Sequence, residues 1–117
     1  MGFEIQTRAV GPVVVIEAVG RFTSTDARTK LRDLIHFLTN SGTKRFVLHL
    51  ERVDFIDSSG IGELLRSHFV VRQRAGDLKL ARVHPKVMDV LRISRMDTIF
   101  DIHPGEEEAL RAFGTNT

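Results

Sequence analysis

Apolar and polar positions follow one another along the chain in two ways, one typical of β-strands and the other of α-helices. Clusters of strand-forming residues, some alternating with polar ones, predict five strands, at residues 3–10, 12–19, 46–50, 78–83 and 99–102. Apolar residues that recur every three or four positions predict four helices, at about residues 23–40, 58–75, 85–91 and 104–113. The predicted order is therefore strand, strand, helix, and then three repetitions of strand and helix.

Short turn signals mark several boundaries. The Gly11-Pro12 pair predicts a turn and an antiparallel hairpin between the first two strands, and Gly20 is expected to close the second strand. The hydroxyl residues at 23–25 are alternative N-caps for the first helix. Because the later strands alternate with helices, they predict βαβ units and parallel pairing. We therefore predict an α/β fold: a single domain over residues 1–117 with a mixed, mostly parallel sheet of about five strands, an N-terminal hairpin and about four helices.

The size and composition fit one ordinary globular domain. The 117 residues are 42% hydrophobic and 27% charged, which is typical of a folded protein. The formal net charge is only +2, with cations scattered among acids, so we expect no direct binding to nucleic acid. The chain lacks cysteine, which excludes disulfides, thiol catalysis and thiolate metal ligands. No signal peptide and no apolar run long enough to cross a bilayer is visible, so we expect no membrane association and a cytoplasmic location.

The stretch at residues 53–62, Val-Asp-Phe-Ile-Asp-Ser-Ser-Gly-Ile-Gly, concentrates small, hydroxyl-bearing and acidic residues between a buried strand and a helix. We expect Asp57, Ser58 and Ser59 to lie at the start of that helix. The first N–H groups of a helix have no partner within it, and the helix dipole places partial positive charge there. A serine in this position can cap the helix, or it can carry a phosphate that the helix end helps to hold.

Neighbouring residues leave alternative roles open. Asp57 is either an N-cap or a residue that positions the serine hydroxyl, and Ser59 is either a cap or a contact residue. Gly60 and Gly62 each cost a helix about 1 kcal/mol relative to alanine. Their presence indicates a close approach, either by the domain's own backbone or by a partner chain. Asp54 is expected to be a solvated loop carboxylate.

The string at residues 57–62, with the apolar strand and the Asp-Phe-Ile that precede it, resembles the signature of STAS domains, the sulfate-transporter and anti-sigma-factor-antagonist domains. The resemblance extends over roughly residues 3–113 and is strongest to the small free-standing bacterial anti-sigma factor antagonists. In that family the first serine of the motif is the phosphorylation site, which corresponds to Ser58. The resemblance implies a partner-binding surface made of the motif and one residue after the second strand: Asp57, Ser58, Ser59, Gly60, Ile61, Gly62 and Thr23.

The resemblance also implies a partner-switching cycle. The unphosphorylated protein would bind an anti-sigma factor that is also a serine kinase of the GHKL ATPase type, and would thereby release a sigma factor. The kinase would then phosphorylate Ser58 with ATP, the complex would dissociate, and a PP2C-type phosphatase would reset the protein. Because a helix start tolerates an anion while an interface does not, we expect the phosphate to block contact with little refolding. No cofactor is expected.

One segment departs from the family's pattern. The well-studied relatives tend to carry acidic residues after the second strand, in the order Gly-Glu-apolar-Asp, whereas this chain has Gly20-Arg21-Phe22-Thr23. We expect this loop to lie near the helix that begins at Ser58, where the change affects which kinase docks and how readily Ser58 is phosphorylated. It also leaves an alternative open, in which the protein is a scaffold subunit of a larger complex, stressosome-like or lipid-transport, without phosphorylation.

A serine hydrolase is the competing enzymatic interpretation. The setting of Ser58 is not Gly-x-Ser-x-Gly, and no histidine is placed by sequence as its base, so we expect no enzymatic activity and no catalytic residue. The run at residues 106–108 is interpreted as acidic helix-start chemistry. The histidines are dispersed without ligand spacing, so no metal site is expected. Each is interpreted as a surface residue or a satisfied core residue: His36, His49, His68, His84 and His103.

Overall fold

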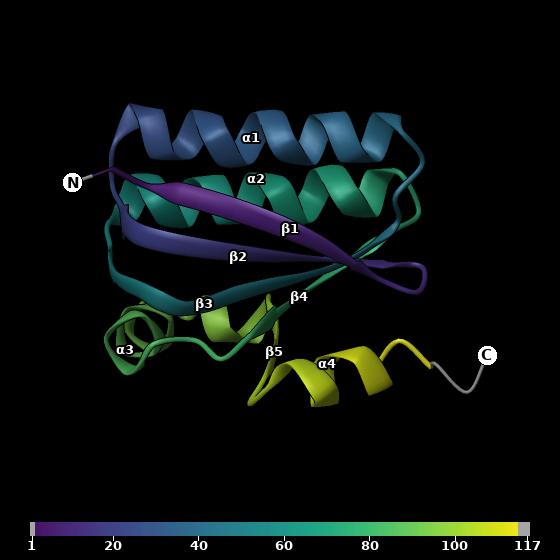
Figure 1. Cartoon of the computed structure of the whole chain (residues 1–117). Coiled ribbons are helices and arrows are strands. Elements are labelled where there is room, and N and C mark those ends of the chain that lie inside the picture. Colours follow the sequence, from purple (N-terminus) through teal and green to yellow (C-terminus); the bar gives the residue numbers. More distant parts are fainter. Residues whose placement is uncertain (1, 115–117) are drawn as a thin grey trace.

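The structure, a computed structural model, describes residues 2–114. Over this range the chain forms five strands, four α-helices and one short 3-10 helix (Figure 1). Their order and bounds are β1 (Glu4–Val10), β2 (Val13–Phe22), α1 (Thr25–Asn40), β3 (Arg45–Ile56), α2 (Ser58–Gln73), β4 (Asp77–Ala81), α3 (Pro85–Ile93), η1 (Met96–Thr98), β5 (Asp101–His103) and α4 (Glu106–Arg111). This is the predicted order, with η1 added before the last strand.

The five strands form one mixed sheet whose spatial order, β1-β2-β3-β4-β5, follows the sequence. β1 and β2 pair antiparallel, with Val10 opposite Val13 across the tight turn. The remaining neighbours pair in parallel, each through a helical crossover. The predicted α/β fold with a mostly parallel sheet and an N-terminal hairpin is therefore confirmed.

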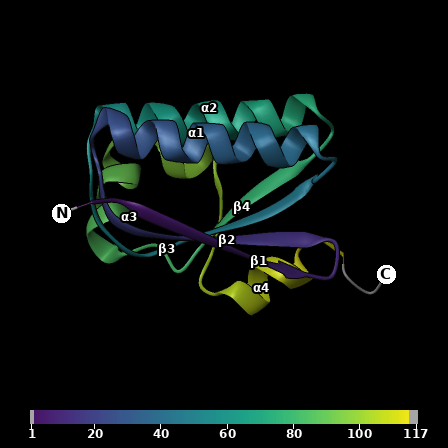
Figure 2. The ribbon, with the colours of Figure 1, turned by 45° about the horizontal axis from the view of Figure 1, so that its top comes forward.

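Helices cover both faces of the sheet. α1 and α2 lie side by side over one face in both ribbon views (Figures 1 and 2). The main core lies beneath them, where Leu31 of α1 and Leu64 of α2 share a cluster with Leu48 of β3. On the opposite face, Ala109 of α4 packs in a smaller cluster against valines of β2 and β3. Apolar side chains on both faces explain why the central part of β3 is apolar at almost every position.

β2 and β3 are both longer than predicted, and these extensions carry the candidate site. β2 continues through Gly20 to Phe22, and β3 continues past Leu50 to Ile56. The two strands pair in parallel along the extension, but the register shifts twice, between Glu17 and Val19 and again between Val19 and Arg21. Such irregularities disturb the alternation of buried and exposed side chains. The alternation that identifies a strand from sequence is therefore missing in residues 51–56, which are exposed, exposed, buried, exposed, exposed and buried.

Several smaller boundaries also differ from the prediction. Asp54 lies in β3 and not in a loop, although its side chain is exposed as expected. α2 ends at Gln73, two residues early, before Ala75 adopts a positive φ of 60°. β4 ends at Ala81 because Arg82 has a positive φ of 52°, which interrupts extended backbone. These errors do not change the order of the elements.

Candidate functional site

The candidate site lies where β3 ends and α2 begins. β3 ends at Ile56, whose side chain is buried in the main core. Asp57 follows in an extended conformation, with φ −115° and ψ −173°, and Ser58 is the first residue of α2. The buried end of the strand thus places the predicted serine at the helix start, at the edge of the domain.

Asp57 is the N-cap of α2. A single carboxylate oxygen, Oδ1, accepts hydrogen bonds from the backbone N–H groups of Ser59 at 3.0 Å and Gly60 at 3.1 Å. The Ser59 hydroxyl donates to the same oxygen at 2.6 Å. That side-chain hydrogen bond is the main cause that lowers the pKa of Asp57; burial opposes it, and the backbone N–H groups reinforce it. A fixed negative charge therefore lies next to Ser58.

Ser58 is exposed, and within residues 2–114 its hydroxyl has no hydrogen-bond partner. The hydroxyl oriented by Asp57 belongs to Ser59, so of the two roles left open for Asp57 the structure shows capping. Two of the N–H groups at the helix start, those of Ser59 and Gly60, already donate to the Asp57 carboxylate in the unmodified protein. A phosphate on Ser58 could accept from these two groups only by displacing that carboxylate.

Ser59 connects the start of α2 to the segment before α1. Its hydroxyl lies 3.4 Å from the carbonyl oxygen of Thr23, in addition to its shorter bond to Asp57. The predicted proximity of this segment to α2 is confirmed. Thr23 itself does not cap α1; Ser24 does, by accepting a hydrogen bond from the N–H group of Ala27 at 3.0 Å.

The two motif glycines have different surroundings. A Cβ atom on Gly60 would lie 2.2 Å from the carbonyl oxygen of Phe22, so the close approach at Gly60 is made by the domain's own backbone. Gly60 is accordingly buried and presents no surface to a partner. A Cβ atom on Gly62 would meet nothing within 4 Å, and Gly62 is exposed beside the half-buried Ile61.

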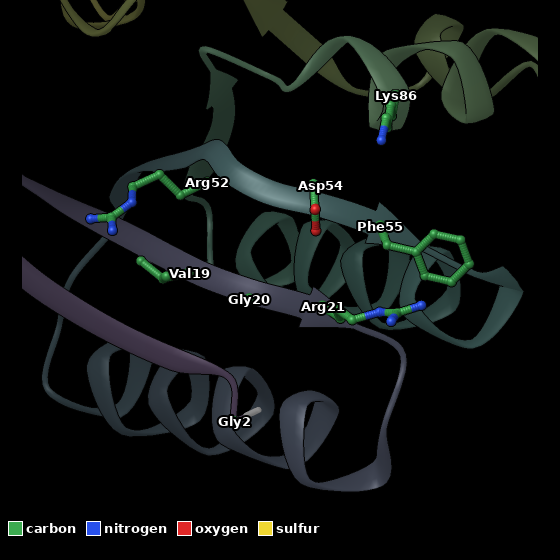
Figure 3. Close-up of a pocket in the computed structure, with 8 residues that line it drawn as sticks. All are labelled: Gly2, Val19, Gly20, Arg21, Arg52, Asp54, Phe55 and Lys86. Carbon is green, nitrogen blue, oxygen red and sulfur yellow. The ribbon is translucent and has the colours of Figure 1, made fainter.

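A hollow of about 750 Å³ opens on the extension of β2 and β3 that precedes this site in the chain (Figure 3). Gly20 and Val19 of β2 line it together with two residues that follow the register shifts, Arg21 of β2 and Phe55 of β3. Arg21 was predicted to matter from the sequence, whereas the hollow was not predicted. The sequence signal that could have indicated it is a large apolar residue, Phe55, inside a polar stretch next to the motif; this residue is 47% exposed.

The hydrogen bonds of the described residues do not assemble a hydrolase site around Ser58. Of the buried histidines, His49 bonds to Glu106 at 2.8 Å between Nε2 and Oε1. His68 packs edge-on against the ring of Phe100, and within the described chain its Nδ1 atom has no hydrogen-bond partner. The prediction of a satisfied core histidine is therefore wrong for His68, and burial is the main cause that lowers its pKa.

Among residues 2–114, no group of three or more histidine or acidic side chains is arranged to hold a metal ion. None of the described helices combines the length and the apolar character needed to cross a bilayer.

Replacing Asp57 by alanine is expected to lower the free energy of unfolding by about 1 kcal/mol, because two N–H groups of α2 lose their acceptor. Asparagine at the same position can still cap the helix, so the free energy of unfolding of Asp57→Asn is expected to remain close to that of the unmodified protein. Urea denaturation followed by circular dichroism measures both. Equal losses in the two variants would show that the charge of Asp57, and not its capping geometry, stabilises α2.

Known proteins share the family and the fold of this chain. The family model of the STAS domain matches residues 4–109, and the chain belongs to the STAS domain family. BtrV of Bordetella bronchiseptica, a candidate anti-sigma factor antagonist, is 37% identical over 76 residues. The aligned part is 65% of this chain and 66%, just under two thirds, of the Bordetella protein.

Solved structures show the same fold. The chain is similar to a candidate anti-sigma factor antagonist from Thermotoga maritima, with a TM-score of 0.85, 22% identity and 92% of both chains covered. It is also similar to the Bacillus cell fate determinant SpoIIAA in its phosphorylated form, with a TM-score of 0.71 and 26% identity. That alignment covers 94% of this chain and 99% of the Bacillus one. The resemblance found in the sequence is confirmed at the level of the family.

Proposed function

We propose that this protein is a cytoplasmic anti-sigma factor antagonist whose binding to an anti-sigma factor is switched off by phosphorylation of Ser58. In this proposal residues 1–117 act as a single STAS domain without enzymatic activity of their own. The partner is an anti-sigma factor with GHKL-type serine kinase activity, and a PP2C-type phosphatase restores the unmodified state. The names of the relatives support the class of function, and one of the similar structures is of a phosphorylated form.

The observation that carries the proposal is the exposed Ser58 hydroxyl, the first side chain of α2, with no partner inside the described chain. In the modification, the γ-phosphoryl group of ATP is transferred to the Ser58 oxygen, the hydroxyl proton is released, and ADP leaves. No packing contact of the domain is lost, because the side chain is already in solvent. We therefore expect the phosphorylated domain to keep its fold.

The effect on a bound partner is different. Phosphorylation replaces a neutral hydroxyl by a group of about −1.5 to −2 charge, next to the ionised Asp57. An interface that covers Ser58 would have to desolvate both charges, and a charge that is buried without a partner is strongly unfavourable. The modification therefore prevents docking and leaves the domain intact. The surface expected to make this contact comprises Asp57, Ser58, Ser59, Ile61, Gly62 and Thr23, since Gly60 is buried.

The switch is tested with the purified chain and the GHKL-type kinase encoded in the same genome. Incubation with ATP and Mg²⁺ is expected to add one phosphate, which mass spectrometry places on Ser58. In calorimetric titrations with the kinase, Ser58→Ala is expected to bind, whereas Ser58→Asp is expected to bind at least about tenfold more weakly because of the unpaired charge.

A matched control separates the position from the added charge. Ser41→Asp places the same substitution at an exposed serine, the C-cap residue of α1. We expect this variant to bind the kinase like the unmodified protein. Equal binding by Ser58→Ala and Ser58→Asp would reject the switch. Absence of a phosphate together with a large stable assembly in light scattering would favour the scaffold, and ester hydrolysis that Ser58→Ala abolishes would favour the hydrolase.

A further inference from the structure

The hollow on the extension of β2 and β3 has an unusual charge for a chain with so small a net charge. Its lining includes three cations, Arg21 of β2, Arg52 of β3 and Lys86 at the start of α3, and a single carboxylate, Asp54 (Figure 3). The three cations come from different elements. Lys86 points from α3 toward the two strands, and the side chains of Arg21 and Arg52 extend in opposite directions along them. The lining is thus predominantly basic, although the chain as a whole carries a formal net charge of only +2.

These cations are not neutralised within the domain. Elsewhere, Arg8, Arg32 and Lys79 form close ion pairs with carboxylates. Within residues 2–114, by contrast, none of Arg21, Arg52 and Lys86 has an ion-pair partner. Their positive field is therefore available to a ligand from outside.

An aromatic surface accompanies the charge. The guanidinium carbon of Arg21 lies over the ring of Phe55, 4.7 Å from its centroid. Stacking of this kind favours a defined orientation of an exposed arginine. Phe55 is 47% exposed, so the hollow offers apolar contact next to its cations.

The chain connects the lining of the hollow directly to Ser58. Arg21 pairs with Phe55 across the two strands, and Phe55 precedes Ser58 by only three residues. Gly20 forms part of the floor: it has a φ of +122°, and a Cβ atom there would lie 2.6 Å from the carbonyl oxygen of Gly2. Ser58 and the lining of the hollow are therefore separated by only a short stretch of chain at the end of β3.

From these observations we propose that the hollow is a docking site for an acidic segment of the partner protein, whose carboxylates face Arg21, Arg52 and Lys86 while an apolar side chain contacts Phe55. This docking site depends on the proposed function only because the acidic segment is taken to belong to the anti-sigma factor. Charge complementarity selects an acidic segment, since a basic one would place like charges together. The site thereby specifies which kind of anti-sigma factor this antagonist recognises.

The same site gives the switch a second component. A phosphate on Ser58 introduces negative charge three residues along the chain from Phe55, which lines the hollow. It would repel the partner's carboxylates and compete with them for the cations. An acidic partner is therefore the kind that phosphorylation of Ser58 displaces most effectively.

The hollow is tested directly with a short fluorescent peptide of alternating glutamate and leucine and the full ¹⁵N-labelled chain at low salt. We expect the largest amide shifts at Gly20, Arg21, Phe55 and Lys86, and no binding by the same peptide with lysine in place of glutamate. Arg21→Glu/Lys86→Glu is expected to weaken binding by at least about tenfold. Arg21→Gln/Lys86→Gln, which only removes charge, is expected to weaken it less.

Arg66→Glu/Arg72→Glu is the matched control, because both arginines are exposed on α2 and the charge change is equal. It is expected to bind the peptide like the unmodified chain. Shifts elsewhere, or equal losses in the two glutamate variants, would overturn the site. If the kinase distinguishes Ser58→Ala from Ser58→Asp but the peptide does not bind the hollow, the docking site is wrong and the switch stands. If the peptide binds in the hollow but Ser58→Asp binds the kinase as well as Ser58→Ala does, the docking site stands and the switch is wrong.

Discussion

Replacing Gly60 by alanine is expected to lower the free energy of unfolding by about 3 kcal/mol or more, the upper part of the range for overpacked sites. The added Cβ atom would lie 2.2 Å from the carbonyl oxygen of Phe22 and 2.7 Å from Cγ1 of Ile56. One of these atoms belongs to the backbone of β2 and cannot rotate away. The substitution would therefore push α2 away from the strand that carries the hollow.

Gly62, two residues further along the same helix, is the matched control. A Cβ atom there would meet nothing within 4 Å. Alanine has the higher helix propensity, so Gly62→Ala is expected to raise the free energy of unfolding by up to about 1 kcal/mol. Urea denaturation of both variants measures this difference in sign. A Gly60→Ala protein as stable as the unmodified chain would contradict the close contact between α2 and β2.

Replacing Glu106 by glutamine is expected to destabilise the protein by about 2 kcal/mol at neutral pH and to change its response to acid. Arg8 of β1 forms a two-bond ion pair with this carboxylate, one bond being 2.9 Å from Nη1 to Oε2. The Arg8 hydrogen bonds are the main cause that lowers the pKa of Glu106 from 4.5 to about 2; burial opposes them, and His49 contributes further. The figure of about 2 kcal/mol is below the full value of that shift because Arg8 is half exposed to solvent.

The direction of the pH effect follows from the lowered pKa. A carboxylate whose pKa is lower in the folded state than in the unfolded state stabilises the protein fully at pH values above its unfolded-state pKa. This contribution is lost as the pH falls through its folded-state pKa. The difference in stability between the unmodified protein and Glu106→Gln should therefore be constant above about pH 5 and shrink as the pH approaches about 2.

Glu107→Gln provides the control for this measurement, because Glu107 has only a long, exposed pair with Arg111 at 3.5 Å. Its free energy of unfolding should follow that of the unmodified protein at each pH. A constant difference between Glu106→Gln and the unmodified protein down to pH 2 would show that Glu106 acts through packing and not through its charge.

The sequence by itself predicted the order of the elements, the class of the sheet and the position of Ser58. These features depend on local properties: the spacing of apolar residues, the Gly11-Pro12 turn, and the capping residues before α2. The STAS signature extended this prediction to a family, and residues 4–109 match the family model.

The extents of β2 and β3 were not predictable in this way. Register shifts disturb the two-residue period on which strand prediction depends, so residues 51–56 lacked the expected pattern. Asp54 was consequently assigned to a loop. Arg52 and Lys86 received no role, because only the pairing of β2 with β3 and the position of α3 bring them to one hollow.

Tertiary structure also decided between alternatives that the sequence left open. The cap at Asp57, the buried contact of Gly60 and the ion pair that joins Glu106 to Arg8 each depend on which groups meet in space. In the last case the partners are 98 residues apart in the chain. Periodicity and capping are encoded by neighbouring residues, whereas such contacts are set by the packing of distant segments; the sequence therefore determined where the serine stands, and the folded chain determined what surrounds it.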